Sequence, residues 1–112
     1  MRVLYVLHIQ VDPAVEAEWK AWTLEKHIPD VLAEAGFTRA SLYDVESPEA
    51  EWPGYVVIYS LDSYEELQRY LASPALVRLR NDVTYRYGPR VRITREVLRQ
   101  EAVVHPAAPA PA

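Results

Sequence analysis

The chain has 112 residues, half of them hydrophobic and a quarter charged, which is the size and composition of a single globular domain. It contains no cysteine, so disulfide bonds, thiolate catalysis, iron–sulfur clusters and cysteine zinc sites are excluded. The net charge of −4 argues against nucleic acid as a partner. Three glycines are too few for a phosphate-binding loop.

The first segment, residues 2–11, is apolar on both faces at a period of two, which predicts a strand that is covered on both sides. A signal peptide is the alternative. However, His8 and Gln10 interrupt the apolar run, and Asp12-Pro13 follows where a cleavage site would be expected. No stretch approaches the roughly 18 consecutive apolar residues of a membrane span. We therefore expect no membrane partner and a cytoplasmic location.

A helix is predicted over residues 13–27, with Asp12 as its N-cap and a proline at its first position. Pro29 cannot donate a backbone hydrogen bond and disfavours helical geometry at the residue before it. We therefore expect a kink or a break at the sequence H-I-P. A second helical piece, residues 30–35, then ends at Gly36.

Two further strands are predicted, residues 37–45 and 55–61, because both segments have a strand period. The acidic, proline-marked loop between them suggests a long hairpin. Ser63 and Glu66 then have the spacing of a capping box, in which each side chain accepts from the other residue's backbone amide. A second helix is expected to begin directly after Ser63.

This second helix is predicted to break and restart at Ser73, which precedes a proline, and to end at Gly88. The last strand covers residues 91–97 and could extend as far as Val104. The C-terminal tail, residues 101–112, is rich in alanine and proline, and we expect it to be disordered or extended.

The order strand, helix, strand, strand, helix, strand over residues 1–100 is that of a ferredoxin-like α+β domain. Its helices lie on one face of a four-stranded antiparallel sheet, yet the strands are apolar on both faces. We therefore expect a homodimer, in which the second face packs against another copy. The alternative is that Val103 and Val104 fold over this face. The two apolar sets are Val3, Tyr5, Leu7, Val57 and Tyr59 on one face, and Leu4, Val6, Val56 and Ile58 on the other.

The run EWKAWTLEKHIPDVLAEAGFTRASLYDV, residues 18–45, combines W-x-x-W, HIP, and a glycine and phenylalanine that open a strand. It resembles an uncharacterised small bacterial family of the dimeric α/β-barrel superfamily, and DSYEELQRYL and RYG are similar to that superfamily's second helix. Relatives include cofactor-independent monooxygenases, small lactone isomerases, stress-responsive barrel proteins and haem-binding enzymes. The resemblance implies a ligand site between sheet and helices, but names no substrate.

His27 has three possible roles. It could end the first helical segment, where it would bond the carbonyls that Pro29 leaves free. It could line a ligand pocket, or it could act as a catalytic acid or base. On a straight helix it lies about 80° from Trp19 and about 140° from Trp22, and the kink could turn it toward a cavity.

The first helix carries two apolar stripes, which cannot both face the sheet, and the sequence does not choose between them. One stripe consists of Val15, Trp19 and Trp22, and the other of Ala17, Ala21, Leu24 and Ile28.

Four aromatic residues are candidates for the wall of a ligand pocket, namely Tyr5, Tyr59, Trp19 and Trp22. Aromatic side chains at alternating strand positions are also common in an ordinary core, so both interpretations remain open.

Arg95 is a charge among the apolar neighbours of its strand and needs a partner. The partner could be a structural acid such as Glu18 or Glu25, or an anionic group of a ligand. His8 is expected to be a core histidine with its hydrogen bonds satisfied, with ligand binding as the alternative. Its distance from His27 in the sequence gives no metal-ligand spacing, so we expect no metal and no cofactor.

These observations predict a homodimeric α/β barrel that binds a small aromatic ligand between its helices and its sheet. The alternative is a cofactor-independent monooxygenase or isomerase, with His27 as the general base and Arg95 or Tyr59 stabilising the oxyanion. A third possibility is a purely structural dimer module, which would have no cavity.

Overall fold

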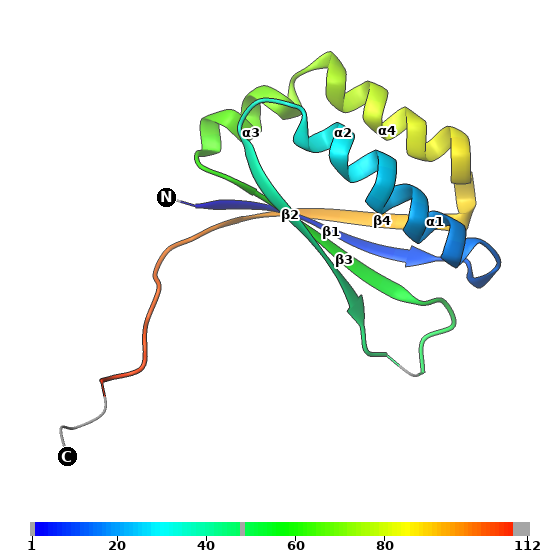
Figure 1. The fold of residues 1–112 in the computed structure, drawn as a ribbon, viewed down its shortest axis with the longest axis horizontal. Coiled ribbons are helices and arrows are strands. Elements are labelled where there is room, and N and C mark those ends of the chain that lie inside the picture. Colours follow the sequence, from blue (N-terminus) through cyan, green and yellow to red (C-terminus); the bar gives the residue numbers. More distant parts are fainter. Residues whose placement is uncertain (1, 48, 109–112) are drawn as a thin grey trace.

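The computed structural model describes residues 2–47 and 49–108. One antiparallel sheet with the strand order β2-β3-β1-β4 forms its base, and every helix lies on the same face of this sheet (Figure 1). The predicted ferredoxin-like α+β fold is therefore confirmed. The strands are β1 (Val3–Val11), β2 (Phe37–Val45), β3 (Gly54–Leu61) and β4 (Val91–Arg99); the helices are α1 (Glu16–Trp22), α2 (Ile28–Leu32), α3 (Tyr64–Leu71) and α4 (Pro74–Tyr87).

The first helical segment begins as predicted, because the Asp12 side chain accepts a hydrogen bond of 2.9 Å from the amide of Ala14. The sequence predicted a kink or a break at H-I-P, and the break is wrong, because the helical segment continues through Pro29. Instead, a π-helical turn, η2 (Thr23–His27), joins α1 to α2, and the amide of Ile28 donates to the carbonyl of Thr23. A wider turn accommodates a proline whose ring would otherwise meet the carbonyl four residues back.

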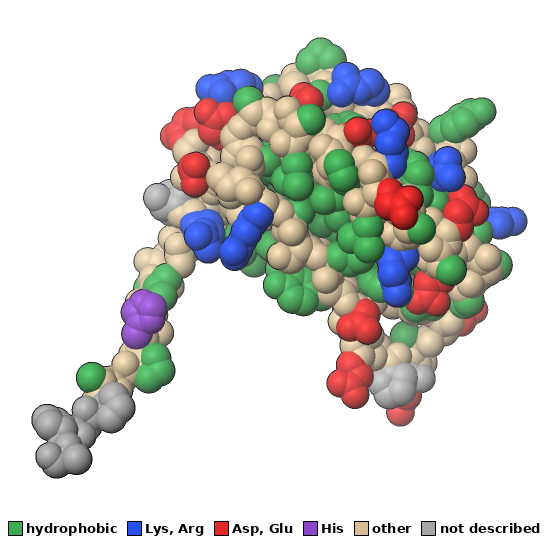
Figure 2. All heavy atoms as spheres, viewed as in Figure 1, with side chains coloured by type: hydrophobic (Ala, Val, Ile, Leu, Met, Phe, Trp, Pro, Cys, Tyr) green, Lys and Arg blue, Asp and Glu red, His purple; other side chains and the backbone are tan. Residues whose placement is uncertain are grey.

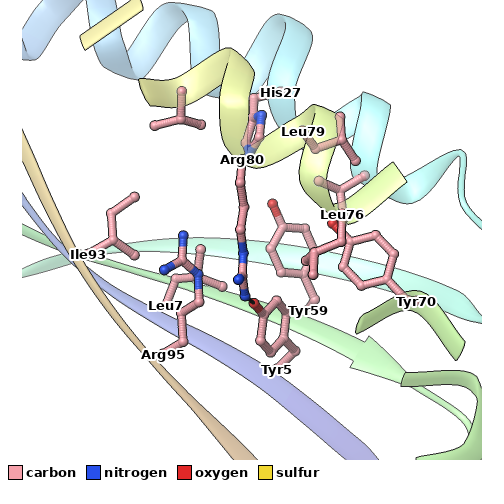
Figure 3. A pocket seen from close by; sticks show the side chains of 12 residues that line it. Tyr5, Leu7, His27, Tyr59, Tyr70, Leu76, Leu79, Arg80, Ile93 and Arg95 are labelled. Atoms are coloured by element: carbon pink, nitrogen blue, oxygen red, sulfur yellow. Dashed lines mark hydrogen bonds between the residues drawn. The ribbon is translucent and has the colours of Figure 1, made fainter. Parts of the chain in front are cut away.

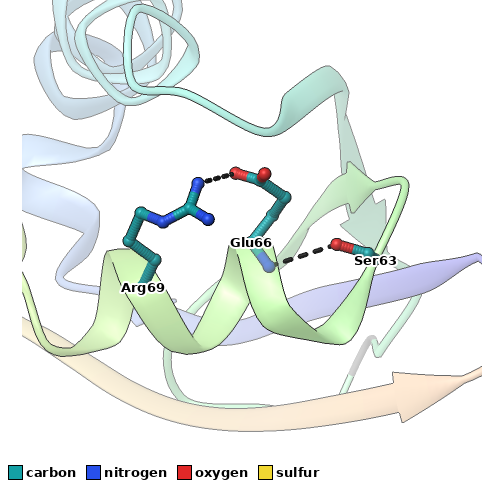
Figure 4. A network of polar contacts seen from close by, with 3 residues as sticks. All are labelled: Ser63, Glu66 and Arg69. Atoms are coloured by element: carbon teal, nitrogen blue, oxygen red, sulfur yellow. Dashed lines mark hydrogen bonds and ion pairs between the residues drawn. The ribbon is translucent and has the colours of Figure 1, made fainter.

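The second helical region also follows the prediction, with one correction (Figure 4). Ser63 Oγ accepts from the amide of Glu66 at 3.2 Å, so α3 is capped. The Glu66 carboxylate does not reach back, because it accepts from Arg69 Nη1 at 2.8 Å. The predicted restart is confirmed, since Ser73 Oγ caps α4 by accepting from the amide of Leu76 at 3.3 Å.

The core lies between the sheet and the helices. All nine helix-facing residues of the two central strands are buried; they are Val3, Tyr5, Leu7, Ile9, Val11, Tyr55, Val57, Tyr59 and Leu61. Trp19 is 2% exposed and packs on Tyr55, with ring centroids 5.0 Å apart, so the tryptophan stripe of the first helix is the one that faces the sheet.

The other face of the sheet, which we call the outer face, is not covered by any helix of the described residues (Figure 1). Its centre is apolar, with Leu4, Val6, Val56 and Ile58 on the two central strands. Strand β4 ends at Arg99, and residues 101–108 lead away from the sheet. Val103 and Val104 are 58% and 89% exposed and do not cover the outer face. The last residues of the tail, 109–112, lie outside the described residues.

Candidate functional site

A small cavity lies between the sheet and the helices, at the place implied by the family resemblance (Figure 3). Its volume is about 30 Å³, which is room for one or two water molecules. The walls are aromatic and aliphatic, and polar atoms come from three tyrosines, one histidine and two arginines. The lining residues are Tyr5, Leu7, His27, Val31, Tyr59, Tyr70, Leu76, Leu79, Arg80, Val83, Ile93 and Arg95.

Three tyrosines from three different elements form one wall of the cavity. The ring of Tyr5 on β1 lies 6.3 Å from that of Tyr59 on β3 and 6.5 Å from that of Tyr70 on α3. Burial raises the pKa of Tyr59 and raises that of Tyr70 to about 12, because water no longer stabilises the phenolate. Both phenols therefore stay protonated at neutral pH and can donate a hydrogen bond to an anion.

Two arginines supply positive charge beside these phenols. Arg80 on α4 donates from Nη2 to Tyr5 Oη at 3.0 Å, across the space that separates helix and sheet. Arg95 pairs in register with Leu7 and faces the helices from β4. Both arginines have exposed side chains, so they lie where the cavity meets solvent. No carboxylate of the described residues forms an ion pair with either.

His27 ends the π-helical turn and reaches the cavity from the helical layer. Its ring stacks on Trp22 with centroids 5.1 Å apart, and its Nδ1 is buried without a hydrogen-bond partner among the described residues. Burial lowers the pKa of His27; the carboxylates of Asp82 and Asp30 oppose this effect, and the charge of Arg95 adds to it. The imidazole is therefore neutral at pH 7, which is the form that can accept a proton.

Four of the seven predicted site residues come together at this cavity: His27, Tyr5, Tyr59 and Arg95. The sequence analysis missed Tyr70 and Arg80. Tyr70 follows the buried Leu67 by three residues and so shares its face of α3, a signal that the sequence contained. Arg80 follows Leu76 by four residues, but nothing in the sequence indicates that this face meets Tyr5.

The other three predicted site residues do not line the cavity. Trp19 packs on Tyr55, and Trp22 stacks on the ring of His27. His8 was expected to be a core histidine with its hydrogen bonds satisfied, and this is wrong, because its side chain is exposed. It lies on the outer face, with Nε2 3.5 Å from Glu96 Oε1, because its neighbours Val3, Tyr5, Leu7 and Ile9 take the opposite face of the strand.

The sheet therefore separates His8 from His27, and the two imidazoles cannot form a joint site. Within residues 2–47 and 49–108, no group of three His, Asp or Glu side chains is placed to hold a metal ion. The helices of this part of the chain are also too short or too polar to cross a membrane.

Fold and cavity together define a ferredoxin-like α+β domain with an aromatic site between its two layers. Residues 2–101 match the family described as domain of unknown function (DUF4286), and the chain belongs to this family. The predicted membership of an uncharacterised family with a ferredoxin-like fold is thereby confirmed. No curated protein matches the chain.

Several solved structures share the fold. A variant of SnoaB, a cofactor-independent oxygenase from Streptomyces nogalater, has a TM-score of 0.69 and 17% identity over 92% of this chain and 96% of SnoaB. HapK from Hahella chejuensis has a TM-score of 0.68 and 10% identity over 96% of this chain and 100% of HapK. A protein of the ethd family from Bacillus halodurans has a TM-score of 0.65 and 15% identity over 88% of this chain and 98% of that protein. At these identities the likeness shows the fold alone.

Proposed function

We propose that the chain is a cytoplasmic homodimer that binds a small, acidic aromatic molecule, such as a phenol or an enol, between its helices and its sheet. The observation that carries this proposal is the convergence of Tyr59, Tyr70 and His27 with Arg80 and Arg95 on one cavity. Aromatic walls favour a flat apolar ring, and the phenols and guanidinium groups favour a negative oxygen on it.

Arg80 is the group that has to move for such a ligand to enter. A cavity of about 30 Å³ holds water but no aromatic ring. The Arg80 side chain is long and exposed, and its bond to Tyr5 Oη is its one side-chain hydrogen bond within the described residues. When Arg80 swings outward, it gives up this bond and can form a charge-assisted bond to the ligand's anionic oxygen instead.

A titration with small aromatic acids and quinols tests this proposal, with the His27 ring followed by NMR. We expect a subset of these compounds to shift the His27 resonances. In Arg80→Ala the affinity for acidic ligands should fall about tenfold, the value of one charge-assisted hydrogen bond. Arg78→Ala is the matched control, because Arg78 is exposed on α4 and does not line the cavity. If no compound moves the His27 signals, the proposal fails.

The second candidate is a cofactor-independent monooxygenase or isomerase, and the neutral, buried His27 favours it. In this mechanism His27 takes a proton from the bound phenol or enol, and Tyr59 or Arg95 stabilises the oxyanion that results. The anion then reacts directly with oxygen, or the protonated His27 returns the proton to a carbon atom of the anion, which gives the keto isomer. The likeness to SnoaB, itself a cofactor-independent oxygenase, supports this candidate.

Oxygen uptake and product analysis with the ligands found by titration separate the two candidates. An enzyme consumes oxygen or isomerises the ligand, and His27→Phe lowers the rate by about 10²-fold or more while the ligand still binds. A binding protein shows neither reaction at any pH. A structural dimer module, the third possibility, would bind none of the compounds.

A further inference from the structure

Two buried polar atoms of the first helical segment have no hydrogen-bond partner within the described residues. They are Oγ1 of Thr23 and Nδ1 of His27, and no other buried side-chain nitrogen or oxygen of this part of the chain lacks a partner. Charged side chains, by contrast, are spread over the surface of the helices and around the hairpin tip (Figure 2). Thr23 is 3% exposed, so its hydroxyl is shielded from bulk water. Two such atoms on one turn of helix call for a common explanation.

The π-helical turn places both side chains on the same side of the helix. Thr23 begins this turn and His27 ends it. Residues four apart share one face of a helix, and side chains lean toward its N-terminal end, so the His27 ring lies over the turn that contains Thr23. The ring contacts agree with this direction, because the imidazole stacks on Trp22 with centroids 5.1 Å apart. On a straight α-helix Trp22 would lie about 140° away from His27.

A threonine hydroxyl in a helix can donate and accept hydrogen bonds at the same time. It donates its proton to the backbone carbonyl four residues earlier, here that of Trp19, and its lone pairs stay free to accept. An Nδ1–H group of His27 is a donor that can use these lone pairs. With the proton held on Nδ1, the neutral imidazole has its own lone pair on Nε2. Because the ring lines the cavity, Nε2 is then the nitrogen that it offers to a ligand.

We infer that Thr23 is a positioning residue, whose hydroxyl accepts the Nδ1–H of His27 and fixes the tautomer in which Nε2 accepts a hydrogen bond from a ligand hydroxyl. This inference rests on the ligand site of the proposed function and deepens it by naming the ligand group, a phenolic or enolic O–H. A general base requires the same tautomer, so the second candidate function depends on Thr23 as well. In the opposite tautomer Nε2 carries the proton, and it cannot take one from the ligand.

The nitrogen NMR shifts of the His27 ring report the tautomer directly, at a pH where the ring is neutral. We expect the wild type to carry its proton on Nδ1. Thr23→Val keeps the shape of the side chain without the hydroxyl, and it should lower the ratio of the Nδ1–H to the Nε2–H form about tenfold, the value of one hydrogen bond. Thr23→Ser is the matched control, because it keeps the hydroxyl and should keep the wild-type ratio. A ratio that Thr23→Val leaves unchanged overturns the inference. A wild-type ring protonated on Nε2 also overturns it, and that result needs no variant to fold.

A pair of matched ligands, hydroquinone and its dimethyl ether, tests the consequence for binding. We expect the wild type to bind hydroquinone about tenfold more tightly than the ether, because only hydroquinone can donate to Nε2. Thr23→Val should lose most of this preference, and Thr23→Ser should keep it. A preference that Thr23→Val retains contradicts the role of Thr23. A wild-type protein that binds neither compound contradicts the named ligand group, whereas the tautomer ratio still decides the role of Thr23. The proposed function fails only if the whole panel of acids and quinols leaves the His27 signals unmoved.

Discussion

His27 shows how one turn of helix changes the chemistry of a side chain. The π-helical turn before Pro29 leaves the imidazole stacked on Trp22, with Nδ1 buried and without a partner among the described residues. A buried polar atom without a hydrogen-bond partner lowers stability, because it loses its bonds to water and gains none in return. The lowered pKa of His27 should therefore be measurable as a pH dependence of folding.

We expect the free energy of unfolding to fall as the pH drops below about 6.5, the ordinary pKa of histidine. Burial lowers the pKa of His27 in the folded state, so in this range the unfolded chain binds the proton first and is favoured. One such group contributes a slope of at most about 1.4 kcal/mol per pH unit. His27→Phe, measured by urea denaturation at several pH values, should lose this part of the slope.

The exposed His8 provides the control for this measurement. His8→Gln should keep the wild-type slope from His27, because His8 lies on the other face of the sheet beside Glu96. Equal slopes in the wild type and His27→Phe would contradict a buried, neutral imidazole.

The sequence predicted the cavity residues that lie on strands, because alternation along a strand determines which face of the sheet a side chain points to. Tyr5, Tyr59 and Arg95 follow from the two-residue period of β1, β3 and β4. Arg80 could not be predicted, because its contact with Tyr5 depends on where α4 crosses the sheet. The expected burial of His8 was wrong for a similar reason, since the sequence does not say which apolar face the helices cover.

Among the elements, the first helical segment departs most from its sequence pattern. A straight helix places Ile28 in one stripe with Ala17, Ala21 and Leu24, yet these three are exposed and Ile28 is 8% exposed. The π-helical turn adds a residue to one turn and so rotates everything after it relative to α1. Periodicity alone predicted the helix but not this change of phase, which is what brings Ile28 into the core.

The end of this helical segment depends on Gly36. Its φ is +93°, and a Cβ atom here would lie 2.6 Å from Glu66 Cβ on α3. Gly36→Ala should therefore lower the free energy of unfolding by about 2–4 kcal/mol, because backbone strain and the displacement of α3 add together. Urea denaturation monitored by tryptophan fluorescence measures this loss.

Gly88, at the end of α4, separates these two effects. It also has a positive φ, +54°, but a Cβ atom there meets nothing within 4 Å. Gly88→Ala should lose only the strain component, about 1–2 kcal/mol. If the two variants lose the same stability, the close approach of a Cβ atom at residue 36 to Glu66 does not contribute to the loss.

For the whole molecule, the distribution of apolar surface determines the assembly that we propose. The helices bury the helix-facing residues of both central strands, whereas Leu4, Val56 and Ile58 on the outer face stay partly exposed. The sequence predicted two apolar faces because both alternating sets of residues along β1 and β3 are largely apolar. It could not indicate the direction of the tail, which leads away from this face instead of covering it.

Ile58→Glu tests whether a second copy covers the outer face. Ile58 lies on the central strand β3, paired with Val6 in register, so a glutamate there would meet the partner's apolar surface and be buried without a counter-charge. We expect the dimer Kd to rise about a hundredfold or more, as measured by sedimentation, while circular dichroism shows an intact fold.

Val77→Glu is the matched control, because Val77 is 57% exposed on α4, on the opposite side of the molecule. This variant should leave the Kd unchanged. Ile58→Ala removes apolar area without adding charge and should weaken the dimer to a smaller degree. A wild-type dimer that Ile58→Glu leaves intact would mean that the copies meet through another surface, and that the outer face is open to a different partner.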